Sequence, residues 1–142
     1  VKNGISWRQS VYYPLYFASL YGRGESLQLK IKSPKYSSDI FDDVTYIDAS
    51  AVINKEEKTL SFFLINRSEE EIVDLDFDLN NLQINKIIDQ QIINHPNIYA
   101  SNTNDKPNEI VPKKTNIATF QNENLMAKIP KLSYLFILLK IK

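Results

Sequence analysis

Beyond the first two dozen residues, apolar and polar side chains alternate in short runs that end at turn-forming residues. Leu27, Leu29 and Ile31 alternate with polar residues as far as Ser33-Pro34, and a period of two is typical of a strand with one buried face. Similar runs predict strands at residues 44–53, 60–66, 73–79, 84–93, 116–120, 125–129 and 133–141. Short strands with regular turn signals predict an all-β fold, an antiparallel β-sandwich of jelly-roll-like form.

The last predicted strand, residues 133–141, is apolar on both faces. Alternate side chains of a strand point to opposite sides of the sheet. Here each side receives large apolar residues: Tyr134, Phe136 and Leu138 on one, and Leu135, Ile137 and Leu139 on the other. A strand of this kind lies centrally or between two layers. We therefore expect it in the middle of the sandwich.

One helical segment, within residues 6–21, precedes the strands. Ser10 is the expected N-cap and Pro14 falls near the first turn, where its missing N–H costs little. Gly22 is expected to end the helix. Apolar residues surround this helix on nearly every side, and such a helix is normally buried on several sides. A small sandwich covers only part of it, so we expect an absent neighbour, and self-association or disorder of residues 1–24 without one.

Composition narrows the classes of function. The 142 residues suffice for one domain with a proper core. Lys and Arg together number 17, as do Asp and Glu, so no net field favours a nucleic acid or an anionic membrane. The absence of cysteine excludes disulfides and thiolate chemistry. The longest apolar run, Leu135–Leu139, is too short to span a bilayer, and residues 1–9 lack the apolar core of a secretory signal, so we expect a soluble domain.

Most of the candidate chemistry lies in a long loop predicted at residues 93–112. It contains the only histidine, His95, with three of the six prolines and five asparagines. Loops of about twenty residues are usually functional or disordered. His95 has no second histidine or cysteine to share a metal and no nucleophile elbow beside it. We therefore predict no catalytic, cofactor-binding or metal-ligating residue here, and a loop whose Asn, Thr and Pro residues fix its backbone.

Acidic and aromatic residues give the remaining candidates. Asp74, Asp76 and Asp78 share one face of a predicted strand, where solvent surrounds them, and a calcium loop would need a turn with a glycine. Residues 69–71 read as a charged turn. Glycoside hydrolysis needs two carboxyls at a set separation, and no acidic residue has the apolar surroundings of a raised pKa. The aromatics of residues 12–21 could stack on a sugar, but helical spacing favours packing.

Six segments, in this order, carry a resemblance to a known family: Tyr12–Gly24 (YYPLYFASLYGRG), Tyr46–Asn54 (YIDASAVIN), Leu60–Glu70 (LSFFLINRSEE), His95–Thr103 (HPNIYASNT), Pro107–Lys114 (PNEIVPKK) and Pro130–Leu139 (PKLSYLFILL). Together they cover nearly the whole chain. Their order and spacing are similar to the C-terminal part of family 51 α-L-arabinofuranosidases. In that family the last barrel helix leads into a β-sandwich.

The resemblance implies that residues 1–24 are a remnant of the last helix of a (β/α)8 catalytic barrel and that residues 25–142 are the C-terminal β-sandwich. In that family, two glutamates on the barrel strands carry out retaining hydrolysis of terminal arabinofuranosyl groups. No residue here matches either motif, so no catalytic residue carries over and the chain alone is expected to be inactive. A strand from the family's extreme N-terminus is also absent, and a start at Val1 instead of methionine agrees with an excised or truncated piece.

The expected role is therefore structural, in the cytoplasm, with no cofactor. The implied partner is the catalytic barrel of the same polypeptide, with other copies of the chain as a second option, and neither a nucleic acid nor a membrane. Two alternatives stay open. A carbohydrate-binding sandwich would need exposed aromatics on one sheet face, whereas Phe62, Phe77 and Phe136 mostly fall on inward positions. An interaction module unrelated to sugars is the other.

Overall fold

The structure, a computed structural model, describes residue 4 and residues 6–80 and 82–142. Among these residues it contains one α-helix and eleven strands, and every strand pairing is antiparallel. The elements are α1 (Tyr12–Tyr21), β1 (Glu25–Leu27), β2 (Lys35–Tyr36), β3 (Val44–Thr45), β4 (Ile47–Asn54), β5 (Thr59–Asn66), β6 (Val73–Phe77), β7 (Ile84–Asn94), β8 (Lys113–Lys114), β9 (Ala118–Gln121), β10 (Asn124–Ile129) and β11 (Ser133–Ile141).

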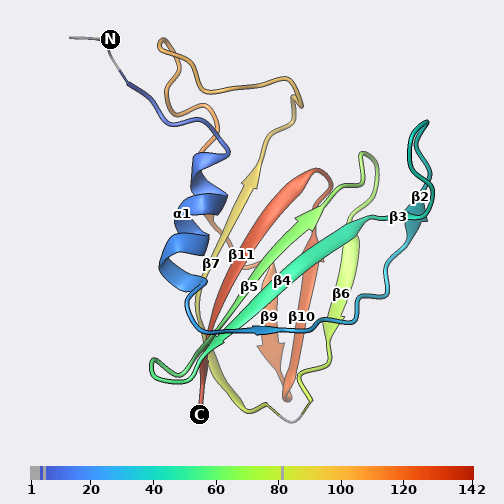
Figure 1. The fold of residues 1–142 in the computed structure, drawn as a ribbon, viewed down its shortest axis with the longest axis vertical. Helices are drawn as coiled ribbons and strands as arrows, with labels where there is room; N and C mark the ends of the chain where they lie inside the picture. The colour runs from blue at the N-terminus through green and yellow to red at the C-terminus, as the bar shows by residue number, and fades with distance from the viewer. Residues whose placement is uncertain (1–3, 5, 81) are drawn as a thin grey trace.

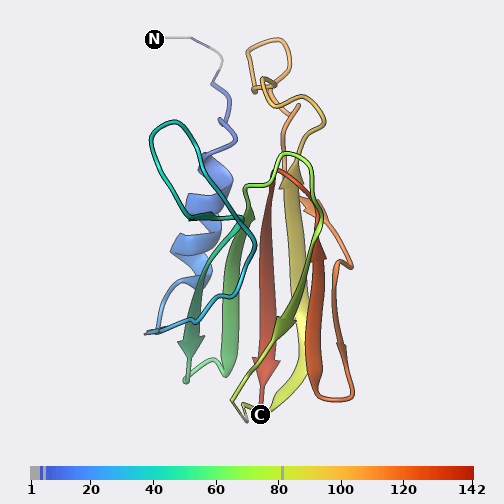
Figure 2. The ribbon, with the colours of Figure 1, turned by 90° about the vertical axis from the view of Figure 1, so that its right-hand side faces the viewer.

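The strands form two stacked sheets. The larger sheet has the order β1-β4-β5-β11-β7-β8 and the smaller one the order β6-β10-β9, while β2 and β3 pair separately. The smaller sheet covers one face of the larger sheet, and α1 lies against the opposite face (Figures 1 and 2). The prediction of an all-β antiparallel sandwich preceded by one helix is confirmed.

Strand β11 occupies the centre, as its two apolar faces predict. It pairs with β5 on one side and with β7 on the other. Leu135, Ile137 and Leu139 are buried against the smaller sheet, in a mainly aliphatic cluster. Phe136 and Leu138 are buried on the opposite face, in a second cluster that includes helix residues. Both faces of β11 therefore contribute to a core.

Two sequence predictions about the first strands need correction. The strand expected over residues 26–32 is only three residues long, because β1 is an edge strand that pairs with β4 alone and leaves it after Leu27. Leu29 and Ile31 still pack against the aliphatic cluster, so their alternation reflects contact with the core rather than strand pairing. Residues 35–43, for which no strand is predicted, contain β2, which pairs with β3 and makes a small hairpin.

The helix is shorter than the segment that predicts it. It begins at Tyr12, with Val11 at the N-cap position and no side-chain capping bond. Ser10 is thus not the N-cap, since it contributes only its main-chain carbonyl, 3.3 Å from the Tyr13 nitrogen. Gly22 does end the helix, and its N–H donates to the Ala18 carbonyl at 2.8 Å. A Cβ at Gly22 would lie 2.5 Å from that carbonyl oxygen, so a side chain at this position would force the backbone to shift.

Candidate interaction site: helix α1 and the 95–112 loop

The inner side of α1 is held to the larger sheet by aromatic stacking. Phe17 stacks on Phe136 of β11 with ring centroids 4.7 Å apart and planes 7° apart, and Tyr21 stacks on the same ring at 5.0 Å. Tyr13 and Phe17 are the buried residues of the helix. They lie one turn apart, as residues on a single helix face must. Only a narrow strip of α1 therefore faces the sheet.

The outer side of α1 is apolar and uncovered. Its exposed large residues are Val11, Tyr12, Leu15, Tyr16 and Leu20, of which Leu15 is 66% exposed. The Arg8 guanidinium lies over the Tyr12 ring, 4.9 Å from its centroid. The helix is thus apolar nearly all round, as predicted, and the sandwich covers only one side of it. Since residues 12–21 form a helix packed on the sheet, their disorder is not observed, and self-association stays a prediction.

Asn102 is the most deeply buried polar residue of the long loop, at 1% exposure. Its side-chain nitrogen donates to the Arg8 carbonyl at 2.7 Å and to the Ile110 carbonyl at 2.9 Å. Its side-chain oxygen accepts the Ile110 N–H at 2.7 Å. One amide group thus joins both arms of the loop to the segment that precedes α1. This set of contacts, which we call the Asn102 clasp, satisfies the amide with little need for water.

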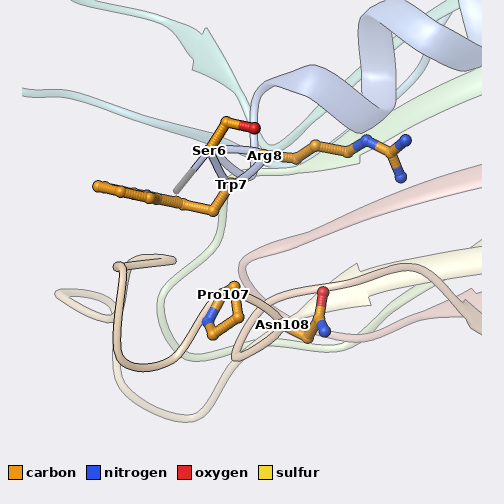
Figure 3. A pocket seen from close by; sticks show the side chains of 5 residues that line it. All are labelled: Ser6, Trp7, Arg8, Pro107 and Asn108. Carbon is orange, nitrogen blue, oxygen red and sulfur yellow. The ribbon is translucent and has the colours of Figure 1, made fainter. Parts of the chain in front are cut away.

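The same clasp is reinforced from the N-terminal side. The Trp7 indole N–H and the Gln9 side-chain amide both donate to the main-chain carbonyl of Asn102, each at 2.9 Å. Residues 6–8 therefore lie along the loop, where they face Pro107 and Asn108 across a cleft of about 380 Å³ (Figure 3). The loop between β7 and β8 and the chain entering α1 form one hydrogen-bonded unit.

His95 takes part in a local turn. Its Nδ1 lies 3.1 Å from the Asn97 nitrogen, and the Asn97 side-chain oxygen accepts the Tyr99 N–H at 2.9 Å. Its Nε2 lies 3.5 Å from a carboxylate oxygen of Glu109 on the far arm of the loop. The part of the chain that the structure describes holds no group of three His, Cys, Asp or Glu side chains able to bind a metal. These contacts support the interpretation of His95 as a loop residue.

The carboxylates and aromatics of the strands lie where the pattern places them. Asp74, Asp76 and Asp78 are exposed on β6 and just after it, and Asp74 forms an ion pair with Lys128 at 3.1 Å. Phe62 and Phe136 are buried, and Phe77 is half-buried with its ring edge-to-face on Phe62 at 5.0 Å. These three aromatics therefore do not form an exposed platform for a sugar.

A groove that no sequence pattern predicts lies between the residues around the first turn of α1, the start of the loop and the ends of β5, β7 and β11. Its volume is about 620 Å³, and its walls include Pro14, Ile65, Ile98 and Leu132. Tyr134 also lines the groove, and the hydroxyl of this residue is buried without a hydrogen-bond partner among the described residues. Burial raises the pKa of this phenol. No local pattern indicates the groove, because its residues come from six separate segments.

This geometry defines a class of protein. It is an antiparallel sandwich domain with one attached helix, and the outer, apolar side of that helix is uncovered. The loop between β7 and β8 holds the segment before the helix in place through the Asn102 clasp. No helix in the described part of the chain is long and apolar enough to cross a membrane.

Comparison with known proteins gives the family. The sequence model of the alpha-L-arabinofuranosidase C-terminal domain matches residues 1–133, and the chain belongs to that family. It is 37% identical over 139 residues to intracellular exo-alpha-(1->5)-L-arabinofuranosidase 1 of Bacillus subtilis, a match that covers 98% of this chain and 27% of that protein. A relative from Halalkalibacterium halodurans, named intracellular exo-alpha-(1->5)-L-arabinofuranosidase, is 33% identical over 133 residues, covering 94% of this chain and 26% of that protein.

Solved structures give the same fold. The structure of AbfB, a family 51 alpha-L-arabinofuranosidase from Bifidobacterium longum, superimposes with a TM-score of 0.90 at 24% identity, over 98% of this chain and 27% of that one. A family 51 arabinofuranosidase from Xanthomonas axonopodis pv. citri gives a TM-score of 0.71 at 22% identity, over 81% of this chain and 23% of that one. The chain spans about a quarter of the length of the curated relatives it matches. The family predicted from the sequence is confirmed.

Proposed function

We propose that this chain is the non-catalytic supporting domain of an α-L-arabinofuranosidase and that it packs against a catalytic domain of the same polypeptide. The observation that carries the proposal is the outer side of α1, where several large apolar side chains are uncovered in a domain whose family is named for arabinofuranosidases. Apolar patches of this kind mark interaction sites in stable proteins. A catalytic domain within the remaining length of the relatives would supply the missing cover.

The uncovered side of α1 also supports a division of the chain into two parts. Residues 1–24, with α1, belong with the last helix of a (β/α)8 barrel, and residues 25–142 are the sandwich beside it. In support, α1 meets the sheet through a narrow strip while its other sides are apolar. Residues 1–3 and 5 lie outside the described part of the chain.

The activity belongs to the whole protein. The two acidic residues that hydrolyse the glycosidic bond would lie in the catalytic domain, and this chain alone would be inactive. By similarity to relatives named intracellular exo-alpha-(1->5)-L-arabinofuranosidases, the substrates would be terminal arabinofuranosyl groups of oligosaccharides or polysaccharides, and the location would be the cytoplasm. Assembly with further copies of the chain is compatible with this role. The proposal involves no cofactor, metal, nucleic acid or membrane.

Hydrolysis of an aryl α-L-arabinofuranoside tests the proposal. The chain alone should release no phenol above the buffer rate. The part of the Bacillus subtilis relative that precedes the matching region should bind the chain and become more resistant to heat and protease when mixed with it. Activity of the chain alone, or no interaction between the two, would refute the supporting role. Saturable binding of arabino-oligosaccharides by the chain alone would instead favour the carbohydrate-binding alternative.

A further inference from the structure

We propose that the groove beside α1 receives apolar side chains of the preceding catalytic domain, so that the groove and the outer side of the helix form one docking surface. This inference rests on the proposed function, since the occupant is the domain named there. The inference adds a second contact between the two domains, at the groove formed by strand ends and residues 95–100.

The lining of the groove favours an apolar occupant. Ile65 and Ile98 are exposed on its walls, and Ala100, Leu132 and Pro14 contribute further apolar surface. Because most of the exposed surface of the groove is apolar, the groove offers contact area to apolar side chains.

Two of the polar groups on the lining, Asn66 and Arg67, are paired within the domain. The Asn66 side chain donates to the Glu71 and Ile129 carbonyls, both at 3.0 Å, and accepts the Ser68 N–H at 2.9 Å. The Arg67 guanidinium is bound to the Asp48 carboxylate. These two side chains are therefore already engaged within the domain and offer little to a charged or highly hydroxylated ligand.

The groove reaches the N-terminal end of α1, where Ser10 and Pro14 line it. The exposed Val11 and Leu15 belong to the same stretch of chain. A helix of ten residues is about 15 Å long and 10 Å wide, so its outer side alone is small for an interface within one chain, which typically buries about 600–1,500 Å². The groove and the strongly exposed Ile98 and Tyr99 beside it supply additional area.

Photo-crosslinking tests the groove separately from the helix. Benzoylphenylalanine replaces Ile98 in the groove, Leu15 on the outer side of α1, or Ile72, an exposed apolar residue that lines neither surface. The full 142-residue chain is mixed with the part of the Bacillus subtilis relative that precedes the matching region, irradiated, and digested for mass spectrometry. We expect crosslinks to that part from positions 98 and 15, at least fivefold above those from position 72.

Each other outcome contradicts a defined statement. Crosslinks from position 15 alone would leave the proposed function standing and overturn the groove as a docking site. Crosslinks from neither position would overturn both. Crosslinks from position 98 to a second copy of the chain, or equal yields from positions 98 and 72, would also overturn the inference.

A groove-filling substitution provides a second measurement. Ala100→Trp places a bulky ring in the groove and should weaken binding of the same catalytic part at least tenfold by calorimetry, whereas Ile72→Trp should leave it unchanged. Circular dichroism of both variants verifies the fold. Unchanged binding by folded Ala100→Trp protein would contradict the inference.

Discussion

The two faces of the larger sheet bury different kinds of core. On the face toward the smaller sheet, strand residues such as Leu135, Ile137 and Leu139 pack in an aliphatic cluster that is closed by a second layer of strands. On the face toward α1, Phe136 is surrounded by the rings of Phe17 and Tyr21 and by Phe63. A single helix covers this second face, and its own outer side remains exposed.

The difference shows which interactions the domain completes by itself. Both layers of the aliphatic core belong to this chain, with β6, β9 and β10 covering β4, β5 and β11. The aromatic face ends in an uncovered apolar helix and a groove. We infer that the aliphatic side provides the stability of the domain, while the aromatic side is adapted to contact with a neighbour.

The largest expected effect is on the aliphatic side. Ile137→Ala removes a fully buried side chain between the two sheets, and substitutions of this kind cost about 2–5 kcal/mol. Chemical denaturation should show this loss as one cooperative transition for the whole domain. Ile72→Ala, at an exposed site, should change stability by less than about 0.5 kcal/mol. A loss for Ile137→Ala as small as that of the control would mean that the aliphatic core does not stabilise the domain.

A smaller and more local effect is expected on the aromatic side. Phe17→Ala removes the ring that stacks on Phe136. We expect the helix to detach without unfolding the sandwich, so the global loss should stay below the roughly 3–5 kcal/mol typical of a core phenylalanine. Amide hydrogen exchange should quicken over residues 12–21 and stay unchanged in β5 and β11. Leu15→Ala, on the outer side, is the matched control, and equal loss of protection in helix and sheet would contradict the independence of the two faces.

The sequence predicts these two faces unequally well. The alternation of residues 133–141 places the side chains of β11 correctly on both faces, because strand periodicity is a local property. Apolar residues on nearly every side of α1 likewise indicate that the sandwich alone does not cover the helix. The groove and the Asn102 clasp depend on contacts between segments more than ninety positions apart, such as Arg8 with Asn102. No local signal specifies such contacts, although turn-forming residues do indicate an ordered loop.

The clasp links the aromatic face to the chain that enters it, and a substitution at Asn102 tests this link. Asn102→Ala leaves the Ile110 N–H and the Arg8 and Ile110 carbonyls without their amide partner. Buried groups left unpaired cost about 1–3 kcal/mol. We expect faster hydrogen exchange at Ile110 and a freer Trp7, seen as a change in its fluorescence. Asn104→Ala, at an exposed site in the same loop, should change neither, and a silent Asn102→Ala would show that the clasp contributes nothing.

The smallest effect concerns Asp89, at the margin of the aromatic side, where its cross-strand neighbour is Leu138. Burial alone would raise the pKa of this carboxyl, but hydrogen bonds from Lys114 and Gln91 outweigh it and hold the pKa below the ordinary value of 3.8. A carboxyl with a lowered pKa in the folded state adds stability above the unfolded-state pKa, and this stability is lost as the pH falls through the folded-state pKa.

Lys114→Met removes the main partner of Asp89, so the variant should lose less stability than the parent chain when the pH is lowered from 5 to 2. Because Lys114 is largely exposed, the difference should be only about 0.2–1 kcal/mol. Denaturation at both pH values measures it, with Lys128→Met, which removes the exposed pair on β10 with Asp74, as the control on the opposite layer. A pH response unchanged in Lys114→Met but altered in Lys128→Met would place the titrating contact on the smaller sheet instead.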